Sequence, residues 1–143
     1  MSKRPSGRVS EVRSRNMAAI RGKDTKPEMV LRRALHRADF RYRLHVQDLP
    51  GRPDIVLPKH RLAIFVHGCF WHHHNCPAFV WPKTRAAFWR EKIEANVARD
   101  RKARAALRRA GWRTMVVWEC ELRRYGGGER SARRIRNRAD ARV

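Results

Sequence analysis

The order of apolar and polar positions in the first half of the chain predicts one helix followed by three strands. Thr25 and Glu28 form a capping-box pattern with Pro27 between them, so a helix should begin here and run to residue 37 or 38. Strict alternation over 40–46 predicts a half-buried strand. Two further strands are predicted at 54–57 and at 61–66; the second is uninterrupted and apolar, so it should lie in the middle of the sheet.

The second half continues with a long helix and a fourth strand. Apolar residues at helical spacing, namely Phe88, Trp89, Ile93, Val97 and Leu107, predict a helix over 85–110, and Gly111 ends it. Residues 112–118 predict a strand with Cys120 at its end. This order indicates a small α/β domain whose sheet is flanked by helices.

Two basic segments flank this core, which we expect to span 25–122. Residues 1–24 are interpreted as a basic arm with a short helix that carries Arg15, Asn16 and Met17. This helix would either bind DNA or be a solvated helix without such a role. Residues 123–143 form an arginine-rich tail, helical after 129, to which the sequence assigns no function.

Charge points to a polyanionic partner. The 143 residues contain 35 Lys and Arg against 13 Asp and Glu, a net charge of +22, and this favours nucleic acid over an anionic membrane. Part of the arginine excess could instead reflect genomic base composition. The sequence contains neither an apolar run long enough to span a bilayer nor a signal-peptide pattern. A monomer in the cytoplasm, associated with the nucleoid and without a membrane partner, is therefore expected.

The segment 67–77 concentrates metal-ligand chemistry directly after the most apolar strand. Cys69, His74 and Cys76 are three candidate ligands, and Cys120 supplies a fourth, so a tetrahedral Cys₃His zinc site is predicted. The alternative is three free thiols beside a histidine-rich surface loop. Spacing alone does not decide which histidine of 72–74 is a ligand.

Three acidic residues have both a structural and a catalytic interpretation. Asp54 begins a strand just after a proline, so its carboxylate should point out at the sheet end, where active sites are built. Asp100 lies one helical turn before Arg104, and a weak ion pair would explain it. Glu28 is explained better by the capping box than by catalysis.

The aromatic residues are similarly ambiguous. Phe70 and Trp71 lie in the loop, where burial against the sheet is harder, whereas Trp112 and Trp118 lie in a strand and are expected in the core. Trp89 has the spacing of a residue that packs a helix onto the core.

Several segments together resemble the very short patch repair (Vsr) endonucleases, over roughly residues 10–122. The most specific is the Gly-Cys-Phe-Trp-His-His-His block at 68–74; Asn75 departs from the run of histidines common there. The other matching segments are 13–20, 50–54, 88–100 and 111–120.

The resemblance implies a restriction-endonuclease-like core of the PD-(D/E)xK type and a magnesium-dependent enzyme that nicks one strand of double-stranded DNA beside a T:G mismatch. Mg²⁺ would be held by Asp54 and the backbone carbonyl of Val66. His72 would be the general base, with Asp100 holding its imidazole. Glu28 and His67 also match active-site positions of the family.

The resemblance further implies that zinc is structural and that aromatic residues enter the DNA. Cys69, His74, Cys76 and Cys120 would pin the loop to the sheet end. Phe70, Trp71 and Trp89 would push between base pairs at the mismatch, where unstacking costs least.

Two other functions fit the same residues. One is a related nicking nuclease with another lesion or a defence role, and the other is a non-catalytic, zinc-stabilised DNA-binding protein. Repair proteins are conceivable partners that the sequence does not identify.

Overall fold

The computed structural model describes residues 25–77, 79–124 and 127–141. The basic arm, with Arg15, Asn16 and Met17, lies outside these residues, so its DNA-binding role stays a prediction. The elements are, in chain order, α2 (Lys26–Arg37), β1 (Arg43–Leu44), β2 (Ile55–Leu57), the 3₁₀ turn η1 (Pro58–His60), β3 (Leu62–His67), α3 (Ala86–Arg109), β4 (Arg113–Trp118), α4 (Glu119–Arg124) and α5 (Glu129–Asp140).

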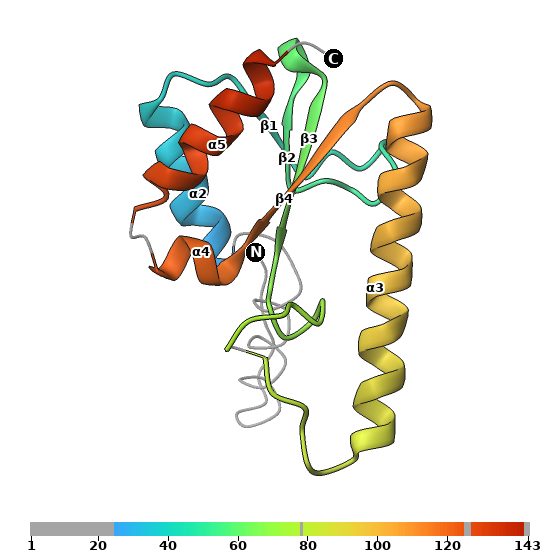
Figure 1. Cartoon of the computed structure of the whole chain (residues 1–143). Helices are drawn as coiled ribbons and strands as arrows, with labels where there is room; N and C mark the ends of the chain where they lie inside the picture. Colours follow the sequence, from blue (N-terminus) through green and yellow to red (C-terminus); the bar gives the residue numbers. More distant parts are fainter. Residues whose placement is uncertain (1–24, 78, 125–126, 142–143) are drawn as a thin grey trace, which may run out of the picture.

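The strands form one mixed sheet in the order β1-β2-β3-β4 (Figure 1). The β1 and β2 pair and the β2 and β3 pair are antiparallel, whereas β3 and β4 are parallel along six residues, from Leu62 opposite Arg113 to His67 opposite Trp118. The long helix α3 makes the crossover between these parallel strands. The mixed sheet flanked by helices is confirmed, and β3 is an inner strand as predicted.

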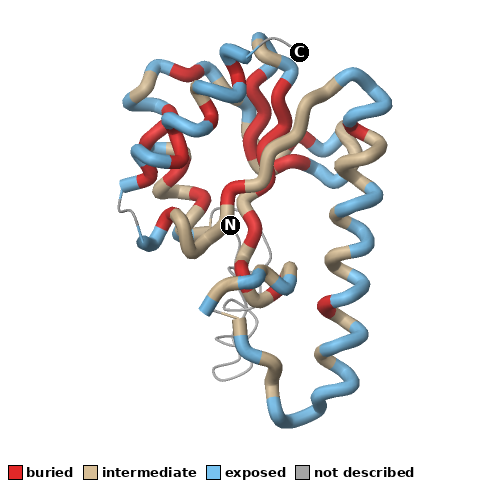
Figure 2. The backbone as a smooth tube through the Cα atoms, in the orientation of Figure 1, coloured by how far each residue is buried: buried red, intermediate tan, exposed pale blue. Residues whose placement is uncertain are grey.

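Alternate residues of β3 face two separate apolar layers. Leu62 and Ile64 join the larger core, together with Val117 of β4 and buried residues of α2, α4 and α5. Ala63 and Phe65 face the other way and pack with Leu107 of α3. Helices α2, α4 and α5 therefore cover one face of the sheet and α3 covers the other, and β2 and most of β3 are buried between them (Figures 1 and 2).

The strand predicted over 40–46 is much shorter than expected. Only Arg43 and Leu44 pair with β2, and the left-handed backbone of His45, with a φ of 50°, ends the strand directly after them. The alternation itself is real, since Phe40 and Val46 are buried and Arg41 is exposed. The predicted burial pattern of residues 40–46 is therefore correct, whereas the predicted length of the hydrogen-bonded strand is wrong.

The chain after β4 also differs from the prediction. Cys120 lies in the first turn of α4, a helix that the sequence analysis missed, and not at a free strand end. The predicted helix after 129 is present as α5, and it packs against α2 through a buried face that includes Ile135. This segment is part of the folded core.

In the described part of the chain, no helix has the length and apolar character needed to cross a membrane.

Candidate functional site

The end of β3, the start of β2, the first turn of α2 and the middle of α3 bring four acidic or histidine side chains together. Asp54 directly precedes β2, and its Oδ2 accepts a hydrogen bond of 2.8 Å from the Val66 N–H of β3. Burial raises the pKa of Asp54 above its ordinary 3.8, while the Val66 N–H and the charges of His67 and His45 offset part of this rise. An acid at this sheet end was predicted, and the neighbouring Val66 backbone was expected from the resemblance.

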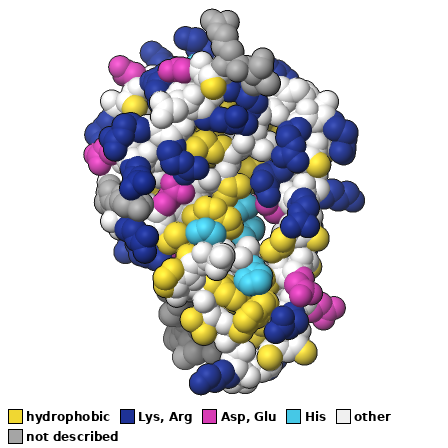
Figure 3. Space-filling model, viewed as in Figure 1, with side chains coloured by type: hydrophobic (Ala, Val, Ile, Leu, Met, Phe, Trp, Pro, Cys, Tyr) yellow, Lys and Arg dark blue, Asp and Glu magenta, His cyan; other side chains and the backbone are white. Residues whose placement is uncertain are grey.

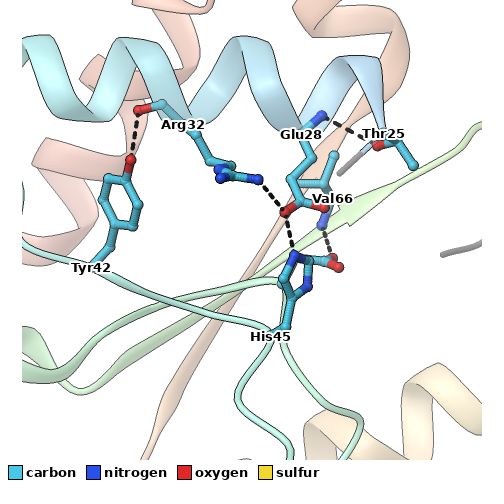
Figure 4. Close-up of polar contacts among 7 residues, drawn as sticks. Thr25, Glu28, Arg32, Tyr42, His45 and Val66 are labelled. Carbon is cyan, nitrogen blue, oxygen red and sulfur yellow. Dashed lines mark hydrogen bonds and ion pairs between the residues drawn. The ribbon is translucent and has the colours of Figure 1, made fainter. Parts of the chain in front are cut away.

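Glu28 faces the same place from α2 (Figure 4). Thr25 caps the helix by accepting the Glu28 N–H at 3.4 Å, so the threonine half of the capping box is present. The Glu28 carboxylate, however, is only 1% exposed, and its Oε2 lies 2.9 Å from His45 Nε2 and 3.5 Å from Arg32 Nη1. Capping alone therefore does not explain Glu28, whose side chain extends toward the sheet.

Asp100 contacts a different histidine from the one expected. Its Oδ1 lies 2.9 Å from His67 Nε2 and its Oδ2 accepts from Arg104 Nε at 2.9 Å, so the predicted pairing of Asp100 with the His72 ring is wrong. Burial opposes ionisation of Asp100, but the hydrogen bond from His67 and the charges of His67 and Arg104 keep its pKa below 3.8. The predicted ion pair with Arg104 is confirmed.

His72 nevertheless belongs to the same group, because its ring stacks on the His67 ring. The two ring centres are 3.7 Å apart and the planes differ by 2°. Burial, together with the charge of His67, lowers the pKa of His72 to about 4, although Asp100 acts in the opposite direction. Its Nδ1 is buried and has no hydrogen-bond partner among the described residues, an arrangement more typical of functional sites than of structural histidines.

The four predicted zinc ligands come together. One ligand atom from each of Cys69, His74, Cys76 and Cys120 lies within 4.8 Å of the others. Cys120 Sγ is 3.5 Å from His74 Nδ1, and a tetrahedral zinc ion with ordinary bond lengths would separate these atoms by about 3.6 Å. All three cysteines are free, so they are not used in disulfides.

The metal cluster also has supporting contacts. Burial raises the pKa of the Cys69 thiol to about 12, so a bound cation is needed to hold it as a thiolate. The Cys69 N–H donates to Glu119 Oε1 at 3.3 Å, and the His74 ring stacks on Trp118 with ring centres 3.8 Å apart. The donor set and its surroundings fit a structural zinc ion.

The loop aromatics are more buried than the sequence analysis assumed. Trp71 is 7% exposed and its carbonyl accepts a hydrogen bond from Asn96 of α3 at 3.4 Å, so the expectation that burial here is hard was wrong. Phe70 and Trp71 each contact Trp89 edge-on, with ring centres 5.4 and 5.7 Å apart. Trp89 therefore packs on the loop, and the neighbouring Phe88, predicted for the apolar face of α3, is instead 42% exposed.

One face of the molecule carries many basic side chains. Lys and Arg gather over the upper part of the face drawn in Figure 3, and histidines lie between two apolar patches below them. A face of this kind suits a polyanion.

One member of the site was missed entirely. His45 contacts Glu28, yet it stands in an alternating segment whose other polar residues are arginines, and no motif marks it. The hydrogen bond from its backbone N–H to the Asp54 carbonyl, at 3.0 Å, places it beside the site.

Comparisons with known proteins identify the family of this chain. The family model described as DNA mismatch endonuclease Vsr matches residues 9–78. The type II nicking enzyme V.XorIIP of Xanthomonas oryzae pv. oryzae is 52% identical over 119 residues, which cover 83% of this chain and 88% of that protein. The DNA mismatch endonuclease Vsr of Escherichia coli K12 is 50% identical over 111 residues, covering 78% and 71%. The type II nicking enzyme V.NmeAIP of Neisseria meningitidis serogroup A is 45% identical over 111 residues, covering 78% and 79%. With relatives this similar over most of its length, the chain belongs to the Vsr family of DNA endonucleases, and DNA is its substrate.

Proposed function

We propose that this endonuclease uses Mg²⁺ to nick one strand of double-stranded DNA beside a T:G mismatch. The convergence of Asp54, Glu28, His67, His72 and Asp100 carries the proposal, because these are the residues that the family resemblance assigns to the active site. The parallel β3 and β4 strands and the acid before β2 are consistent with a core of the PD-(D/E)xK type.

The donor set around Asp54 fits a divalent cation. Carboxylate oxygens of Asp54 and Glu28 lie near one another, and burial has already removed much of the water that would otherwise stabilise the Asp54 charge. In this proposal Asp54 and the Val66 carbonyl hold Mg²⁺. When bound there, the ion supplies positive charge to the phosphate oxygens on which negative charge develops.

His72 is the proposed general base. Because its pKa is lowered to about 4, the ring is neutral near pH 7 and can accept the proton of the attacking water. Asp100 acts on this ring indirectly: it orients His67, and the flat face of His67 supports His72. Burial of Asp100 and His67 keeps this support rigid.

Zinc is proposed as the structural ion of the Cys69, His74, Cys76 and Cys120 cluster. His72 lies two residues before His74, so fixing the loop through His74 also fixes the base. Phe70, Trp71 and Trp89 are proposed to enter the mismatched base stack, which requires Trp71 to leave part of its buried position when DNA binds.

A second candidate concerns the lesion. Two of the relatives described above are called type II nicking enzymes, which supports a nicking nuclease whose role is tied to another site or to defence. The chemistry would be the same, and the DNA recognised would differ.

One assay tests the function. Duplexes that differ only in one T:G or T:A pair are incubated with Mg²⁺, and the strands are separated under denaturing conditions. Nicking of only the T:G duplex, on one strand, is expected. Equal nicking of both duplexes would favour the second candidate, and no nicking of either would refute the proposed function.

A further inference from the structure

His45 lies between two acidic residues of the proposed active site. The Leu44 and Ile55 register places it opposite Asp54, and its N–H donates to the Asp54 carbonyl at 3.0 Å. On the side-chain end, Nε2 lies 2.9 Å from Glu28 Oε2 (Figure 4). The backbone of His45 thus contacts the start of β2, and its side chain contacts the Glu28 carboxylate of α2.

Glu28, His45 and Asp54 form a compact set of donors. One ligand atom from each lies within 4.8 Å of the other two. Neighbouring ligands of an octahedral ion with bonds of about 2.1 Å are roughly 3.0 Å apart, and the 2.9 Å between Nε2 and Oε2 matches this spacing. None of the three residues is exposed, so the set differs from the acidic clusters that are common on protein surfaces.

The imidazole changes which ion the set prefers. Mg²⁺ binds oxygen ligands and usually keeps several waters, whereas Mn²⁺ shares the preference of Mg²⁺ for carboxylate oxygen and, as a first-row transition-metal ion, also accepts imidazole nitrogen. We propose that His45 is a direct nitrogen ligand and that, with Glu28 and Asp54, it forms a divalent-ion site that accepts Mn²⁺ in the place proposed above for Mg²⁺. The proposal deepens the proposed metal-dependent nuclease function, on which it rests for the role of Asp54.

Charge supports this assignment. A doubly charged cation would stabilise two carboxylates that have little exposure to solvent, and it would add to the contact that Arg32 Nη1 already makes with Glu28 Oε2 at 3.5 Å.

Electron paramagnetic resonance tests the site without relying on cleavage. The full chain, with zinc retained, is titrated with Mn²⁺ in the absence of DNA, and electron spin echo modulation is recorded for coupling to ¹⁴N. Wild type and two variants are compared: His45→Asn, because asparagine tolerates a left-handed backbone, and the control His36→Gln, because His36 is an exposed residue of the same helix as Glu28. His45→Gln serves as a second variant if His45→Asn does not retain zinc and a cooperative unfolding transition.

We expect ¹⁴N coupling in the wild type and in the control, its loss in the His45 variant, and at least a tenfold weaker Mn²⁺ affinity in that variant. Absence of ¹⁴N coupling in the wild type would overturn the proposal, even if Mn²⁺ affinity depended on His45, because the residue would then only position Glu28. Coupling that persists in the His45 variant would overturn it too, since another imidazole would be the ligand. Failure of the nuclease function appears separately, as absence of nicking with any metal.

Discussion

Ile135→Ala tests whether the arginine-rich C-terminal segment is a folded part of the enzyme. Ile135 is fully buried on α5 and belongs to the larger core, where it is grouped with Leu31 and Leu35 of α2. Polar contacts also hold α5 in place. Ser131 Oγ donates to Glu121 at 2.8 Å, and Arg113 donates to backbone carbonyls at the end of α5. A helix attached in this way should unfold together with the sheet.

The size of the effect follows from the burial. Truncating a fully buried isoleucine to alanine costs about 2–5 kcal/mol, and the dense packing between α2 and α5 leaves little room for collapse, so we expect about 3 kcal/mol. For a chain of this length this corresponds to a decrease in Tm of roughly 10 °C. A loss of this size is a large part of the total stability of a typical domain.

Urea unfolding followed by tryptophan fluorescence measures this loss, since the chain contains five Trp residues. Arg133→Ala is the matched control, because Arg133 lies on the exposed face of α5, and it should change the free energy of unfolding by less than about 0.5 kcal/mol. If Ile135→Ala is as stable as this control, α5 does not pack on the core and the segment is a tail after all.

Three further predictions concern the site. Asp54→Asn should keep its contact with Val66 but lower the nicking rate at least about a hundredfold, with little change in DNA affinity measured by fluorescence anisotropy; nicking at the wild-type rate would remove Asp54 from the metal site. Cys120→Ser should abolish stoichiometric zinc, measured by plasma mass spectrometry, and should lower thermal stability; retention of one zinc per chain would contradict the four-ligand cluster. Because the pKa of His72 is lowered to about 4, the ring stays neutral as the pH falls through 6, and single-turnover nicking at saturating metal should be nearly equal at pH 8 and pH 6. An ordinary histidine would be only about a quarter neutral at pH 6, so a half-maximal rate near pH 6.5 would show that the pKa of the catalytic base is not lowered as the burial of His72 requires.

The sequence predicted what periodicity and ligand chemistry determine. The apolar run of β3, the cap at Thr25 and the long helix α3 are local patterns, and the structure has them within a few residues. The Cys₃His set was also predictable, because three soft ligands in one loop require a fourth and the chain has a single remaining cysteine, Cys120.

Contacts between distant segments were not predictable in the same way. Asp100 could pair with any histidine that the fold brought near, and in the structure it contacts His67, whose ring stacks on His72. His45 enters the site through a left-handed backbone that its own sequence does not indicate. Trp71 is buried because α3 passes over the loop, which depends on the length and direction of a helix formed later in the chain.

The contacts of Arg113 have a practical consequence for imaging. Its guanidinium contacts the carbonyls of His60, Arg138, Ala139 and Ala141, which anchors the last turn of α5 where β3 and β4 begin, at the opposite end of the strands from His67 and Trp118. A fluorophore attached at Ala141 would lie about 17 Å or more from the proposed active site, because six paired residues of β3 and β4 separate the two ends of the sheet. Such a label should report the binding of single molecules to DNA without obstructing the DNA-binding surface.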